Sequence, residues 1–120
     1  MKYLHLNHAI ALAASMALGC GAAALPVGRV ASTEAAIRAA RETGAANVPR
    51  AALHLHYAEQ QSADAQTLNR NGDSERAALA LRRAEADANL AVAIARQSQA
   101  ERDAHAAVEA QNSPKLTARR

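Results

Sequence analysis

The chain has 120 residues, a formal net charge of +3 at neutral pH, no Phe or Trp, two Tyr and one Cys. The length suits one small domain, and a single cysteine excludes an internal disulfide. The charge is weak and alternates in sign along the chain, without the clustered basic residues and stacking aromatics of a nucleic-acid-binding surface. Few large apolar residues are available for a core, so alanine, the best helix former, predicts an all-helical protein with closely spaced backbones.

Residues 1–20 have the pattern of a bacterial lipoprotein leader. A basic residue, Lys2, precedes a short apolar segment at residues 9–18, and the box Ala17-Leu18-Gly19-Cys20 closes the leader. Secretory leaders combine a basic start, an apolar segment and a small-residue cleavage site. In lipoproteins the cysteine that follows the cleavage site receives the lipid. We therefore expect a signal peptide at residues 1–19 and lipidation at Cys20.

Two other fates of the leader stay open. Cleavage after Ala24 would discard Cys20 and release a soluble periplasmic or secreted protein. An uncleaved leader would serve as a membrane anchor, but a spanning helix needs about 20 strongly apolar residues, and this stretch is rich in alanine and interrupted by glycine. The residue after Cys20 is Gly21, not the aspartate that commonly retains lipoproteins in the inner membrane. The anchored form is therefore expected in the outer membrane of the cell envelope, facing the periplasm.

The first two helices follow a tether. We expect residues 20–31 to form a flexible linker, after which Ser32 or Thr33 caps a helix that runs to about Thr43. Gly44 ends this helix, because glycine tolerates the left-handed backbone of a helix terminus. Pro49 opens the second helix, since proline is accepted in the first turn. That helix is predicted to run to about Asn69.

The third helix is the longest predicted element. A tight turn at residues 70–73 leads into it, and Asp73 or Ser74 provides its cap. Asn112-Ser113-Pro114 is expected to end the helix after Gln111. Residues 32–111 then form the helical domain, and residues 112–120 form a basic, disordered tail.

Small and apolar residues alternate at steps of four and three along the second and third helices. This heptad spacing is typical of a coiled-coil seam, and reflection through Gly72 aligns the two lists in an antiparallel hairpin. The predicted pairs are Ala65 with Leu81, Ser62 with Ala84, Ala58 with Ala88, Leu55 with Ala91 and Ala51 with Ala95; Ala77 extends the list on the third helix.

A second apolar stripe remains once the seam is assigned, formed by Leu53, Leu68, Leu79, Leu90 and Ile94. The first helix offers Ala36, Ile37 and Ala40 to cover part of it, which predicts a three-helix bundle. Beyond Arg96 the third helix extends past the end of the second helix and forms an overhang. This overhang packs on the first helix, binds another copy or protrudes into solvent.

The segments Ala36-Ile37-Arg38-Ala39-Ala40, Gly44-Ala45, Pro49 and Asn71-Gly72-Asp73, set in alanine-rich helices, resemble a bacterial envelope family. It is the family catalogued as domain of unknown function 4398, and the resemblance covers about residues 32–96. The resemblance implies an alanine-rich helical domain behind a lipoprotein-type signal peptide and a location in the envelope. It implies no enzymatic activity, because the family has none agreed. Peptidoglycan binding is not implied either, because it belongs to a separate domain of some relatives.

Candidate catalytic and metal-binding residues do not combine into a site in the sequence. His54 and His56 lie two apart, so on a helix they diverge and cannot share a metal, and the His-x-x-x-His spacing of helical zinc sites is absent. Glu85 and Asp87 diverge in the same way. Glu101 and His105 are four apart and can pair on the helix surface. Ser62 lies in the seam and is interpreted as a packing residue.

These observations predict a small non-enzymatic lipoprotein that acts as a structural or protein-interaction adaptor, with no cofactor, no metal and no small-molecule substrate. Its expected partners are the membrane, through the lipid on Cys20, and an envelope protein or another copy of the chain. The alternative is a soluble periplasmic or secreted helical protein, chaperone-like or stress-related, cleaved after Ala24.

Overall fold

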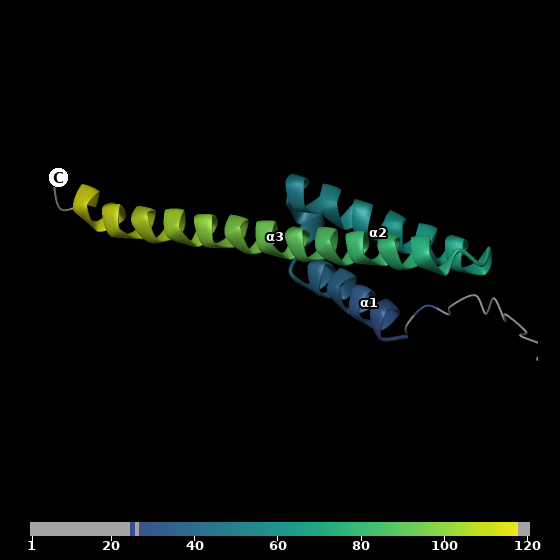
Figure 1. The fold of residues 1–120 in the computed structure, drawn as a ribbon. Helices are drawn as coiled ribbons and strands as arrows, with labels where there is room; N and C mark the ends of the chain where they lie inside the picture. The colour runs from purple at the N-terminus through teal and green to yellow at the C-terminus, as the bar shows by residue number, and fades with distance from the viewer. Residues whose placement is uncertain (1–24, 26, 118–120) are drawn as a thin grey trace, which may run out of the picture.

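A computed structural model describes residue 25 and residues 27–117, with side chains described as far as residue 112. The chain forms α1 (Val27–Glu42), a short 3-10 turn η1 (Ala45–Asn47), α2 (Pro49–Arg70) and α3 (Ser74–Thr117). No strand occurs among the described residues, so the predicted all-α class is confirmed. In Figure 1, α2 runs alongside one half of α3, α1 packs near the middle of the molecule, and the other half of α3 extends alone.

Helix α1 begins at Val27, earlier than the predicted cap at Ser32 or Thr33. Neither hydroxyl acts as a cap, because each lies inside the helix and donates a hydrogen bond to the carbonyl of Arg29. Tertiary packing explains the longer helix. Val30 packs against the buried side chains of Ala65, Ala77 and Leu81, and this contact favours a helical turn where residues 27–31 alone suggest a linker.

Two glycines with positive φ separate the helices as the sequence predicts. Gly44, at φ 78°, ends α1, and Gly72, at φ 82°, lies between α2 and α3. The amide of Asp73 donates to the carbonyl of Leu68, and the amide of Gly72 donates to that of Asn69. This pair of bonds is the Schellman arrangement of a helix C-terminus.

Caps fix where α2 and α3 begin. Val48 is extended, at φ −116° and ψ 112°, as expected of a residue before proline, and Pro49 takes the first helical position. The carboxylate Oδ1 of Asp73 accepts a hydrogen bond from the amide of Arg76 at 3.2 Å. Asp73 is therefore the N-cap of α3, one of the two residues that the sequence proposes for that role.

The predicted seam forms the core of the hairpin. Every seam residue is buried except Ser62, which is half-buried. The buried members are Ala51, Leu55, Ala58 and Ala65 on α2, and Ala77, Leu81, Ala84, Ala88, Ala91 and Ala95 on α3. Leucine is the only large residue type in this list, so the two backbones approach closely and the core is thin, as the composition predicts.

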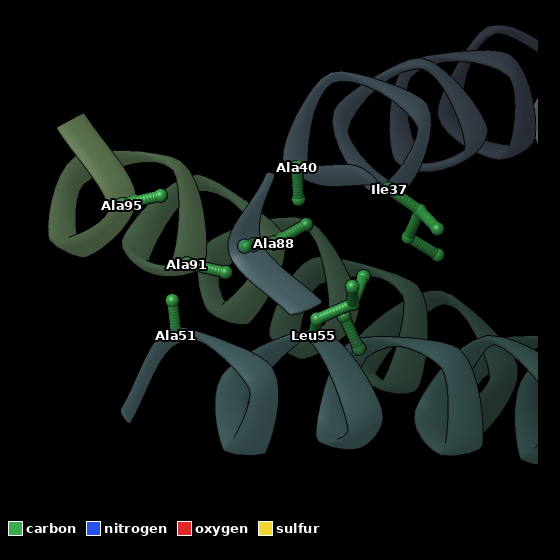
Figure 2. Close-up of a cluster of buried hydrophobic side chains, with 9 residues drawn as sticks. Ile37, Ala40, Ala51, Leu55, Ala88, Ala91 and Ala95 are labelled. Atoms are coloured by element: carbon green, nitrogen blue, oxygen red, sulfur yellow. The ribbon is translucent and has the colours of Figure 1, made fainter. Parts of the chain in front are cut away.

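Helix α1 completes a three-helix bundle by packing on the seam. Ile37 and Ala40 join Ala45, Leu55 and Ala88 in one buried cluster, and Figure 2 shows Leu55 between the ribbons of α2 and α3 with Ile37 and Ala40 above it. Thr33 is fully buried, and its hydroxyl lies 3.3 Å from the carbonyl oxygen of Leu81. Two ion pairs flank the contact: Arg29 with Glu85 at 3.4 Å and Arg41 with Glu59 at 2.6 Å.

The structure corrects the predicted end of α3. The helix continues past Gln111 and through Pro114 to Thr117. Proline lacks the amide that would bond to the carbonyl of Ala110, and this loss usually breaks a helix. In the structure the helix continues with this one backbone bond missing, and only residues 118–120 of the predicted tail lie outside the described part.

Candidate functional site

The predicted lipidation site lies outside the described residues. Cys20 and the whole leader belong to residues 1–24, of which the structure describes nothing, so lipidation stays a prediction. Among the described helices, none contains a stretch long and apolar enough to cross a bilayer.

A polar cluster joins α2 to α3 on one side of the seam. The Nδ1 atom of His54 lies 2.9 Å from Oδ1 of Asp87, and Nε2 of Gln61 donates to Oδ2 of the same carboxylate at 2.8 Å. The ring of Tyr57 meets the imidazole edge-on, with centroids 6.3 Å apart. All three bonded side chains are partly buried, so these hydrogen bonds stabilise the hairpin.

The cluster agrees with the predicted register. With Ala58 opposite Ala88, the neighbouring Asp87 lies between His54 and Gln61, which are four residues before and three residues after Ala58. A carboxylate has enough acceptor sites for both donors. The Oε1 atom of Gln61 is buried and has no hydrogen-bond partner among the described residues.

Sequence reasoning missed this cluster because it compared His54 only with His56 and Asp87 only with Glu85. The signal was present in the spacing. His54 and Gln61 are seven apart on the same face of α2, and a heptad register places an acidic residue of α3 between them. The carboxylate of Asp87 therefore fixes the orientation of the His54 imidazole.

The described residues contain no group of three or more His, Cys, Asp or Glu side chains arranged to hold a metal.

The other candidates are separate from the cluster. His56 and His105 are exposed, and Glu101 accepts a hydrogen bond from Gln97 at 2.9 Å. Glu85 points to the opposite side of the seam from Asp87, where it contacts Arg29 and Ser32 of α1. Glu85 and Asp87 therefore diverge as predicted, and each carboxylate joins α3 to a different helix.

The stripe left over from the seam remains largely uncovered. Large apolar side chains stay exposed at Leu53 (49%), Tyr57 (41%), Leu79 (42%) and Leu90 (44%), whereas Leu68 and Ile94 are partly buried against the core. Helix α1 was expected to cover part of this stripe, but it lies on the side of the seam marked by Glu59 and Glu85. Within the described part of the chain, no third helix lies on the side that carries His54, Tyr57 and Asp87, and a shallow groove there is lined by Gln61, Leu68, Leu79 and Arg83.

The overhang of α3 is exposed along its described length. All side chains from residue 99 to residue 112 are exposed, including Val108 at 56%. Within the described part, this half of α3 therefore packs on no other helix, and Figure 1 shows it extending beyond α2.

No family model, no curated protein and no solved structure matches the chain.

Proposed function

We propose that this chain is a small, non-enzymatic lipoprotein of the bacterial cell envelope that acts as a structural or protein-interaction adaptor. Cys20 is the acylation site, and the mature protein is held at the outer membrane, facing the periplasm. The basic start, the apolar segment and the Gly19-Cys20 pair support the anchor. Gly21, in place of the aspartate that commonly retains lipoproteins in the inner membrane, supports the outer-membrane location.

The interaction role rests on one observation, the set of large apolar side chains that the bundle leaves exposed. Leu53, Tyr57, Leu79 and Leu90 are each more than two-fifths exposed, in a protein whose core has few large side chains. Burying a fully exposed large apolar side chain gains about 1.5–3 kcal/mol, and because these side chains are already more than half buried, covering the rest gains about half of that for each. Contiguous exposed apolar patches mark interaction sites, and these four are the large apolar side chains of the hairpin available to form one.

In-cell photo-cross-linking tests the adaptor role. A photoreactive residue at Leu53 or Leu90 places the probe on the exposed stripe, and the matched control at Glu34 places it on the exposed surface of α1. The adaptor role predicts one or two discrete products from the stripe positions and none from the control. A broad scatter of unrelated proteins, captured by soluble material, would contradict the adaptor role and support the chaperone-like alternative.

A further inference from the structure

Helix α3 carries two heptad lines that behave differently along its length. The inner line is the buried seam, which ends at Ala95 and continues with the polar residues Ser98, Arg102, His105, Glu109 and Asn112. The outer line lies on the opposite face and is exposed throughout the described residues. It consists of Leu79, Arg83, Ala86, Leu90, Ala93, Gln97, Ala100, Ala104 and Ala107.

The contrast between the two lines indicates which face of α3 would bind a partner. The inner line becomes polar where α2 ends, as expected for a surface that loses its partner helix. The outer line keeps its leucine and alanine spacing, interrupted by Arg83 and Gln97, from the bundle into the overhang, although none of the described residues covers it. A face with a/d spacing of apolar residues and flanking charges is typical of a coiled-coil seam, and Leu79 and Leu90 give the outer line the large side chains that its alanines do not supply.

We propose that the occupant of this outer face is a second copy of the chain, packed antiparallel along α3. In this arrangement the overhang of each copy lies on the bundle half of the other. Leu79 packs against Ala104 of the second copy, and Leu90 packs against Ala93. Each layer then joins a large residue to a small one, as Leu55 and Ala91 do in the predicted layers of the hairpin.

Charge complementarity selects this register. The positions that flank the outer line on one side are Arg82, Asn89, Arg96 and Asp103, all exposed. In the proposed register Arg82 lies beside Asp103 of the second copy, twice by symmetry. A shift of one heptad in one direction brings Arg82 beside Arg96 of the second copy, and in the other direction it brings the two Arg96 side chains together. Both shifts place like charges side by side. A shift of two heptads in one direction pairs Arg96 with Asp103 but leaves Leu79 outside the contact, and in the other direction it places Arg82 beside Asn89, with no ion pair, and leaves the overhang outside the contact.

The orientation follows from the polar residues of the outer line. In a parallel, in-register pair the two Arg83 side chains would meet in the seam, and like charges in direct contact are destabilising. In the antiparallel register Arg83 faces Ala100 and Gln97 faces Ala86, so each long polar side chain passes over a small residue and reaches water. The contact from residue 79 to residue 104 spans about 37 Å of helix.

The proposed dimer rests on the adaptor role, because it names a second copy of the chain as the partner of the exposed apolar surface. It does not depend on the lipid at Cys20. Cysteine cross-linking of the full chain in membranes tests it. The double variant L79C/A104C places two thiols in contact across the interface, whereas in either single variant the introduced cysteine is about 37 Å from its own counterpart. The parent chain, with Cys20 alone, controls for cross-links at that residue.

Mild oxidation is expected to convert the double variant to a covalent dimer and to leave both single variants and the parent monomeric. Both positions are exposed, and an unchanged helical circular dichroism spectrum verifies the fold. A dimer from L79C alone would overturn the antiparallel orientation, and no dimer from the double variant would overturn the self-association. A monomer that still carries acyl chains on Cys20 would overturn only this inference and leave the anchor intact.

A charge exchange tests the register independently. Arg82→Glu is expected to reduce the cross-linked fraction of the double variant by roughly three- to tenfold, because two exposed ion pairs are replaced by repulsion with Asp103. Adding Asp103→Arg should restore the fraction to the level seen with Arg82. An equal yield for all three forms would contradict the register.

Discussion

The imidazole of His54 lies 2.9 Å from the carboxylate of Asp87 and ties α2 to α3 on the side of the hairpin that α1 leaves open. The same carboxylate accepts a hydrogen bond from Gln61, so one acidic residue holds two points on α2 that are about 10.5 Å apart along the helix. The other side of the hairpin is secured by α1, through Arg29 and Arg41. The two sides of a thin alanine core are therefore stabilised by different means, one by a polar cluster and one by a third helix.

Replacing Asp87 with Ala tests the polar cluster. The change removes the carboxylate that bonds to both His54 and Gln61, so these two partly buried side chains lose their hydrogen-bond acceptor. The free energy of unfolding should therefore fall by about 1–2 kcal/mol. Urea unfolding followed by circular dichroism measures the change. Asp64→Ala on the exposed surface of α2 is the control and should stay within about 0.5 kcal/mol of the parent. Equal stabilities for the two variants would contradict a stabilising role for the cluster.

Enlarging Ala88 tests the close packing of the seam. Ala88 is fully buried between α2 and α3, so Ala88→Leu forces the backbones apart and should destabilise the hairpin by roughly 1–3 kcal/mol. Thermal unfolding is the measurement. Ala35→Leu adds the same side chain at an exposed position of α1 and should leave the melting temperature nearly unchanged. If Ala88→Leu unfolded at the temperature of the parent, the register would be wrong.

Removing the hydroxyl of Thr33 tests how α1 is docked. Thr33→Val keeps the shape of this buried side chain but removes its one hydroxyl donor, which lies 3.0 Å from the carbonyl oxygen of Arg29 and 3.3 Å from that of Leu81. The expected loss is about 1 kcal/mol, confined to the docking of α1. Hydrogen exchange should therefore speed up in residues 27–42 and remain unchanged in the seam. Faster exchange in α2 and α3 alone would show that Thr33 does not secure α1.

Substituting glycines in different backbone conformations tests the turn. Gly72 has φ 82°, where a side chain is strained, so Gly72→Ala should cost about 1–2 kcal/mol. Gly28 lies inside α1, and a Cβ added there meets no atom within 4 Å. Gly28→Ala should therefore stabilise the protein by about 0.5–1 kcal/mol. Chemical denaturation of the two variants should move the midpoint in opposite directions, and a shift in the same direction would contradict this account of the turn.

The seam and the two glycine turns were predictable because they depend on local patterns. Heptad spacing of small residues determines which positions are buried, and the reflection through Gly72 needs only the turn and the period of the helix. The start of α1 was not predictable in this way. Val30 and Thr33 extend the helix through contacts with α3, and those contacts exist only in the folded bundle.

Other features were missed for different physical reasons. The rule that proline ends a helix describes an average cost, and α3 continues through Pro114 with one backbone hydrogen bond missing. The cluster at Asp87 needs two helices in register, so no inspection of α2 or α3 alone reveals it. The predicted lipid on Cys20 depends on processing by the cell rather than on folding, and it lies outside the described residues.

The most direct test of the proposed envelope anchor is the intact mass of the mature protein, recovered separately from the membrane and soluble fractions of cells. The proposal predicts a membrane-bound species that begins at Cys20 and carries acyl chains. A soluble species that begins at Leu25 would contradict it, because the cysteine would have been removed and the chain would be a free periplasmic or secreted helical protein.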